Sequence, residues 1–173
     1  MKYRNQRMIK FGTSKYFKLE ESNETLREVY NDELPLESRS YTYSTGAVYE
    51  GQWKGGLRHG KGKMKWPGNA SYVGEWQYNQ ACGQGKFVHV EGDFYDGKWI
   101  NNKANGFGIY VNKNGARYEG YWKDDLQQGN GVENWTEGNK YEGQYKMGLK
   151  DGEGKYTYSD GSTYNGSWQA NMI

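Results

Sequence analysis

Cysteine, histidine and proline are almost absent from this 173-residue chain, which contains one cysteine, two histidines and two prolines. A single thiol, Cys82, excludes an intramolecular disulfide and fits a reducing, intracellular setting. Zinc sites use about four ligands, and His59, His89 and Cys82 are too few to supply them. The composition therefore predicts neither a metal site nor a cofactor.

Long apolar runs and aliphatic side chains are also scarce. No run approaches the roughly 20 residues that span a bilayer, and no apolar segment near Met1 resembles a secretory signal. Aromatic residues reach 17%, and glycine accounts for 26 positions, all of them after residue 40 except Gly12. Because aliphatic residues normally fill globular cores, we expect a core in which aromatic rings pack on glycine backbone.

An excess of one charge is missing as well, since 23 basic and 21 acidic residues leave a net charge of +2. Nucleic-acid binding usually requires a clustered basic surface, so this balance argues against a nucleic-acid partner. The first nineteen residues nevertheless contain six basic residues and no acid (Lys2, Arg4, Arg7, Lys10, Lys15 and Lys18), and residues 20–37 contain seven acids against Arg27 alone.

The non-repetitive segment 1–40 is interpreted as a cap or anchor. Its basic block suggests a solvated, flexible arm, or an anchor to an acidic protein surface or anionic lipid. A mitochondrial transit peptide is a further alternative, but serine is rare in it and only two residues are arginine. Residues 22–30 are predicted to form a short helix whose stripe of Leu26, Val29 and Tyr30 packs on the first repeat.

From residue 41 to 173 one pattern recurs with a period of 23 residues: half a unit, five full units and the start of a sixth. Each unit carries tyrosine, then glycine two residues later, then a large aromatic residue. A pair of glycines follows, such as Gly60 and Gly62. A fixed period in this range indicates a repeat architecture. The repeat aromatics are Tyr49, Trp53, Tyr72, Trp76, Tyr95, Trp99, Tyr118, Trp122, Tyr141, Tyr145, Tyr164 and Trp168.

Within a unit the period is two, which predicts strands. We expect a first strand, a loop such as Gly55–His59, a second strand, and a turn at a glycine with positive φ, replaced in the first unit by Asn69. The fold class is all-β: an elongated, twisted, single-layer antiparallel meander of about twelve strands. Each glycine of the pair is expected to be small because a ring lies above it.

Tyr-x-Gly-x-Trp followed by Gly-x-Gly and a turn glycine resembles the MORN (membrane occupation and recognition nexus) repeat over residues 41–173. Tyr145 departs from the pattern by replacing tryptophan, and His89 and Asn112 replace late-strand aromatics. The resemblance implies an elongated scaffold module without a catalytic domain. It also makes the cytoskeleton, and first the ciliary axoneme with its radial-spoke-like assemblies, the expected location.

Two functional hypotheses follow from the two faces of such a sheet. In the first, the aromatic face binds other protein subunits, because exposed aromatic patches mark interaction sites. Its candidate groove residues are Trp66, Phe87, Tyr110, Trp135, Tyr156 and Tyr158. In the second, Lys61, Lys63 and Lys65 bind phosphoinositide or another anionic lipid, although their position opposite acidic residues favours cross-strand charge pairing. Homo-oligomerisation through the unfinished C-terminal edge is a third possibility.

Catalytic signals are weak. Gly55–Lys61 matches part of a phosphate-binding loop, but Gly62 follows where that motif requires Ser or Thr. His59 and Cys82 are expected in adjacent hairpin loops, facing solvent. Asp124 and Asp125 are interpreted as a turn and not as a catalytic pair. We therefore expect no enzyme activity.

Overall fold

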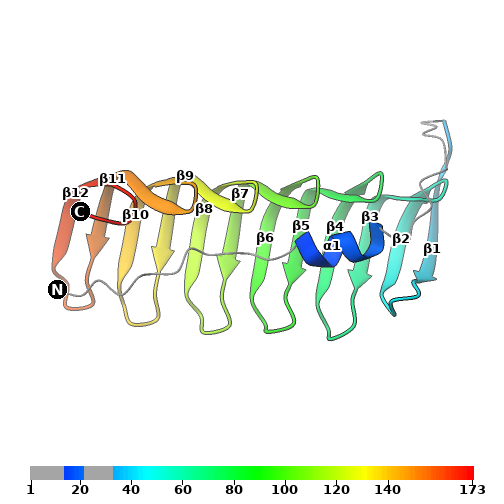
Figure 1. The fold of residues 1–173 in the computed structure, drawn as a ribbon, viewed down its shortest axis with the longest axis horizontal. Helices are drawn as coiled ribbons and strands as arrows, with labels where there is room; N and C mark the ends of the chain where they lie inside the picture. Colours follow the sequence, from blue (N-terminus) through cyan, green and yellow to red (C-terminus); the bar gives the residue numbers. More distant parts are fainter. Residues whose placement is uncertain (1–13, 22–32) are drawn as a thin grey trace.

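The computed structural model describes residues 14–21 and 33–173, and its main feature is one antiparallel sheet of twelve strands in sequential order (Figure 1). The predicted meander is confirmed. The strands are β1 Leu36–Thr42, β2 Val48–Lys54, β3 Leu57–Lys65, β4 Ser71–Gln77, β5 Gln80–Val88, β6 Phe94–Ile100, β7 Lys103–Val111, β8 Arg117–Lys123, β9 Leu126–Asn134, β10 Lys140–Lys146, β11 Leu149–Thr157 and β12 Thr163–Trp168.

The turns at the two ends of the strands differ. Turns between units close with a backbone bond such as Trp66 N–H to the Ala70 carbonyl (2.9 Å). They contain the expected left-handed residue, a glycine in most units and Asn69 (φ 72°) in the first. Turns within units are only two residues long, so the predicted loop Gly55–His59 is wrong. Leu57 already begins β3, because a two-residue turn suffices to join antiparallel strands.

The glycine pair has two separate functions. A Cβ on Gly62 would collide with the Tyr49 ring, which confirms that the second glycine makes room for a ring. Gly60 instead has φ 78° and lies where the β2–β3 register shifts, and its Cβ would meet the Gln52 side chain. The expectation that a ring explains both glycines is therefore wrong for the first one. That glycine is required by the left-handed backbone of a β-bulge.

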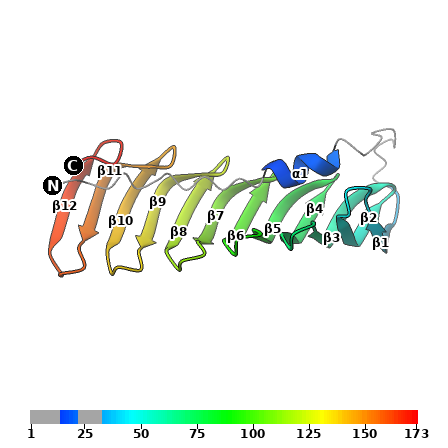
Figure 2. The ribbon, with the colours of Figure 1, turned by 60° about the horizontal axis from the view of Figure 1, so that its bottom comes forward.

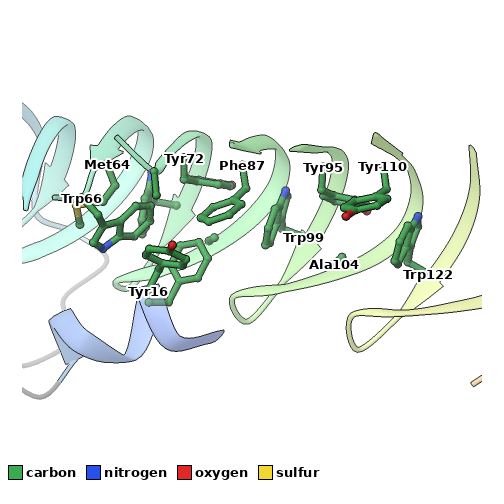
Figure 3. Packing of buried hydrophobic residues seen from close by; sticks show 14 of the residues in the cluster. Tyr16, Met64, Trp66, Tyr72, Phe87, Tyr95, Trp99, Ala104, Tyr110 and Trp122 are labelled. Carbon is green, nitrogen blue, oxygen red and sulfur yellow. The ribbon is translucent and has the colours of Figure 1, made fainter. Parts of the chain in front are cut away.

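The repeat aromatics form a continuous core of edge-to-face contacts along one face of the sheet (Figure 3). Tyr72 contacts Trp76 of its own unit, with ring centroids 5.0 Å apart, and Trp99 of the next unit at 5.2 Å. The Trp99 indole N–H donates to the Gly85 carbonyl at 2.8 Å. The Tyr72 hydroxyl donates to the Glu75 carbonyl at 3.0 Å, beside the register shift. Edge-to-face pairs stabilise by about 0.5–1.5 kcal/mol beyond burial.

Helix α1, Ser14–Glu21, lies over β4 and β5 on the same face as the core rings (Figures 1 and 2). It buries Tyr16 and Phe17, whereas Lys15 and Lys18 are exposed. For these residues the interpretation as a solvated arm is wrong, since the two adjacent aromatic side chains pack on the sheet. The helix predicted over residues 22–30, with Leu26, Val29 and Tyr30, lies outside the described residues.

Candidate partner-binding surface

We call the side of the sheet that carries the core rings the ring face. The candidate groove residues all lie on it, in or just after the second strand of each hairpin. Trp66, Phe87 and Tyr110 are buried, with exposed fractions of 3%, 0% and 9%. Trp135, Tyr156 and Tyr158 are partly exposed. The ring face is therefore covered towards the N-terminal repeats and accessible towards the C-terminal ones.

Helix α1 covers Trp66 and Phe87. The Tyr16 ring lies 5.5 Å from Trp66 and 5.4 Å from Phe87. Phe17 contacts Trp66 at 5.3 Å and Trp99 at 5.9 Å. Figure 3 shows the Tyr16 ring between the helix and the rings of Trp66 and Phe87. Tyr110 lies one repeat further on, and its hydroxyl donates to the Asp93 carboxylate at 3.0 Å.

The accessible part is an aromatic cluster around the fifth hairpin. Trp135 and Tyr156 lie 5.7 Å apart at an interplanar angle of 33°, and Tyr156 lies 4.7 Å from Tyr158. The Lys150 ammonium group lies over the Trp135 ring at 4.8 Å. These rings are held in place by their neighbours yet keep part of their surface in water, so they could contact a partner with little loss of side-chain entropy.

The charged pair of Lys150 and Glu133 packs against this cluster inside the sheet. The Lys150 ammonium lies 3.8 Å from the Glu133 carboxylate, which also accepts a hydrogen bond from the Tyr145 hydroxyl at 2.9 Å. Burial raises the pKa of Glu133 and lowers the pKa of Lys150. Tyr145, the residue that replaces tryptophan in the repeat pattern, thus donates to this carboxylate.

One column of positions near the start of each second strand varies from repeat to repeat. We call these the slot positions, because their side chains enter the space between core rings. They are Arg58, Ala81, Ala104, Gln127 and Lys150, and all are buried. Arg58 places its guanidinium group 4.8 Å from the Trp76 ring centroid and 5.6 Å from that of Tyr43. Comparing the repeats at this position would have shown an unusual mixture of alanine and long polar residues.

The three candidate lipid-binding lysines, Lys61, Lys63 and Lys65, are exposed on the side of the sheet opposite the ring face. Lys61 stands opposite Glu75, and Lys63 opposite Glu50, in strand register. None of the three lysines forms an ion pair within the part of the chain that the structure describes. Their charges are accordingly available to solvent.

The remaining chemical signals have structural explanations. Asp124 and Asp125 form a hairpin turn, as expected, with φ values of 49° and 68°. His59 and Cys82 lie in strands β3 and β5 and not in the predicted loops. The His59 ring packs on Tyr78 with centroids 4.8 Å apart. Across residues 14–21 and 33–173, no three His, Cys, Asp or Glu side chains are grouped for metal binding.

Tyr16 and Phe17 are the functional candidates that the sequence interpretation missed. The only signal for them is a pair of adjacent aromatic residues within a basic segment.

Within the described segments, no helix has the length and apolarity that a membrane crossing would require.

Comparison with solved structures matches the TCP domain of SAS-4 from Drosophila melanogaster, solved with a proline-rich motif of Ana2. The match has a TM-score of 0.41 and 12% identity, and covers 80% of this chain and 68% of the matched chain. Likeness at that level carries no functional inference. Comparison with curated proteins finds no match.

The family model of the MORN repeat matches five consecutive segments: residues 49–71, 72–94, 95–117, 118–140 and 141–163. These are the five full units of the 23-residue pattern, and each contains one hairpin of the sheet. Arrays of this repeat are generally non-catalytic and indicate a scaffold with a protein- or lipid-binding role. The chain therefore belongs to the MORN-repeat family.

Proposed function

We propose that this protein is a non-enzymatic scaffold that binds other proteins through its ring face. The observation that carries the proposal is the docking of α1, which buries the side chains of Tyr16 and Phe17 among core rings. A surface that holds a helix from its own chain has the shape and the apolarity to hold a helix from another. In a longer assembly, the partly exposed cluster of Trp135, Tyr156 and Tyr158 would bind the partner directly.

Physical chemistry favours this cluster as an anchor. Tryptophan and tyrosine dominate binding hot spots because they bury a large rigid area that has one polar edge. Here the rings are mutually packed before binding, so little conformational entropy would be lost. The Lys150 ammonium over the Trp135 ring adds a cation–π contact that fixes the indole.

A co-purification experiment from the native cell tests the proposal. The Trp135→Ala/Tyr156→Ala double variant should lose at least one partner that the wild-type chain retains. The matched control is Phe107→Ala/Tyr121→Ala, which removes an exposed ring pair of 5.7 Å spacing that lies away from the ring face. Equal partner sets for the wild-type chain and the ring-face variant would contradict the proposal.

The cellular setting is proposed from family analogy: a cytoskeletal or ciliary assembly, with a radial-spoke-like axonemal complex as the first candidate. Fluorescence imaging of the tagged full chain in ciliated cells would test it. Self-association through the β12 edge remains a related proposal, since an exposed strand edge can pair with another chain. Light scattering across a concentration series would detect such dimers.

Anionic lipid is the second candidate ligand, and the exposure of Lys61, Lys63 and Lys65 favours it. Each basic residue near an anionic membrane adds about 1 kcal/mol, but Glu50 and Glu75 lie opposite two of these lysines. Co-sedimentation with phosphoinositide-containing vesicles at physiological salt should be lost in Lys61→Gln/Lys63→Gln/Lys65→Gln. Absence of wild-type binding would exclude this role.

A further inference from the structure

The ring sets around the slot positions are related by the 23-residue repeat. In the first hairpin, Arg58 lies over Tyr43, Tyr49 and Trp76 at 5.6, 6.0 and 4.8 Å. In the fifth hairpin, Lys150 lies over Trp135 and Tyr141 at 4.8 and 5.2 Å. Trp135 and Tyr141 lie four repeats after Tyr43 and Tyr49, just as Lys150 lies four repeats after Arg58. The slot is thus a recurrent space between rings.

In the second hairpin the slot residue is Ala81, whose methyl group cannot reach across these rings. The equivalent rings, one repeat after those around Arg58, are Trp66, Tyr72 and Trp99. The side chain that contacts all three is Phe17 of α1, with centroid distances of 5.3, 5.7 and 5.9 Å. Phe17 therefore occupies the space that a long side chain fills from within the sheet in other repeats.

We propose that the Ala81 slot is a recognition site for an aromatic side chain presented by a helix, and that α1 is a built-in competitor for that site. The inference rests on the proposed function, because it names the kind of partner that the ring face binds. That partner is a helix carrying adjacent aromatic residues, like the Tyr16–Phe17 pair, and it binds by displacing α1.

Two observations explain why α1 can be displaced. First, an eight-residue helix is not stable alone, and the contacts of its described side chains with the sheet are ring contacts (Tyr16 also meets His89 at 5.6 Å). Second, the buried indole N–H of Trp66 has no acceptor within the described residues, whereas Trp76 and Trp99 donate to backbone carbonyls. A partner helix with an acceptor at this point would satisfy a group that α1 leaves unpaired.

The first test places a long side chain of the sheet itself in the Ala81 slot. Ala81→Arg recreates the arrangement of Arg58 one repeat later, and should expel Phe17 while the sheet stays folded. Hydrogen exchange of the amides in residues 14–21 should accelerate at least about tenfold, as expected when a locally protected segment opens. Gln127→Arg, at a slot that already holds a long side chain, is the matched control and should leave this exchange unchanged. Slow exchange in strands β4–β6 checks folding.

If residues 14–21 keep wild-type protection in Ala81→Arg, the slot does not hold α1 and the proposal is overturned. Phe17→Ala keeps the slot itself intact and should give the same loss of protection. Wild-type protection in that variant would overturn the proposal in the same way.

The second test measures competition. The probe is a fluorescent peptide of residues 14–21, stapled through the exposed positions 15 and 18. It should bind full-length Tyr16→Ala/Phe17→Ala at least about tenfold more tightly than the wild-type chain, because bound α1 lowers the fraction of free sites. Adding Ala81→Arg to the double variant should abolish binding.

Equal affinity of the wild-type chain and the double variant would contradict the competitor role, and peptide binding in the presence of Ala81→Arg would contradict the slot. The peptide assay requires no cellular partner. A failure of the co-purification experiment would therefore contradict the proposed function without contradicting the proposal for the slot.

Discussion

At the scale of single residues, the tyrosine of each repeat requires glycine as the second residue of the glycine pair, because its ring packs directly on that glycine. The Tyr95 ring lies over Gly108, and its hydroxyl donates to the Lys98 carbonyl at 3.0 Å beside the β-bulge. Burial raises the pKa of Tyr95, so the phenol stays protonated and can donate throughout the usual pH range. The tyrosine side chain thereby fills space in the core and also donates a hydrogen bond to a backbone carbonyl outside the regular strand pairing.

Substituting this glycine should be far more harmful than substituting a turn glycine. Gly108→Ala would drive a methyl group into the Tyr95 ring, and we expect a loss of about 2–4 kcal/mol in the free energy of unfolding. Gly92→Ala is the control, because Gly92 has φ 96° with no atom within 4 Å of the added Cβ, and should lose about 1 kcal/mol from backbone strain alone. Urea unfolding measures both, and equal losses would contradict this explanation.

The buried Glu133–Lys150 pair makes a second prediction. Lys150→Ala leaves the carboxylate buried without its cation and should destabilise by about 3 kcal/mol at neutral pH. The loss should shrink on acidification, since Glu133 has a raised pKa and becomes neutral.

Adding Glu133→Met removes the buried, unpaired carboxylate and should recover part of the stability. Recovery will be incomplete because the Tyr145 hydroxyl loses its acceptor. Chemical denaturation of the single and double variants measures the coupling, and a double variant no more stable than Lys150→Ala would contradict it.

At the scale of elements, the hairpins are joined at their tips by a ladder of side-chain hydrogen bonds. Where the second residue of a tip turn is Asn or Asp, its side chain accepts a bond from the neighbouring hairpin: Asn79 from Arg58 N–H at 2.7 Å and Asn102 from Ala81 N–H at 2.6 Å. Asp125 holds the equivalent place and accepts from Ala104 N–H at 2.7 Å. The left-handed backbone of these positions suits Asn and Asp.

Asp125 should make stability fall with rising pH, because burial raises the pKa of its carboxyl from 3.8 to about 6. Between these values the folded chain binds more protons than the unfolded one, so ionisation favours unfolding. Asp125→Asn keeps the acceptor oxygen and removes this dependence. At pH 7 it should be more stable than wild type by about 1–2 kcal/mol, with the advantage vanishing below pH 4. Thermal unfolding from pH 4 to 7 tests this, and a constant difference would contradict it.

The repeated part of the sequence predicts the hairpins, their order and the inward rings, because period-two alternation and the 23-residue spacing are local signals. The bulge at Gly60 was missed because two glycines spaced two residues apart are also expected where both make room for a ring. The position of α1 could not be predicted: Tyr16 and Phe17 become buried only through contact with Trp66 and Trp99, which are distant in sequence. Likewise, only pairing across strands reveals that Lys150 meets Glu133.

At the scale of the whole molecule, the structure is an elongated sheet with α1 lying over one face towards the N-terminal strands (Figures 1 and 2). The ring face keeps the partly exposed rings of Trp135, Tyr156 and Tyr158 near the C-terminal strands. Neighbouring units contact each other through equivalent ring pairs and through a backbone bond at each hairpin tip, so stability is distributed along the array. Functional difference must then arise from the side chains that vary between units: the slot positions, the late-strand aromatics and the buried Glu133.

The central claim is that the ring face binds protein, and site-specific photo-crosslinking tests it most directly. Benzoylphenylalanine would replace Tyr156 on the ring face or, as the control, Tyr121, which is 53% exposed and pairs with Phe107. After irradiation in the native cell, position 156 should give a discrete cross-linked protein that position 121 does not. Cross-links to the same proteins from both positions, or from position 121 alone, would contradict the account.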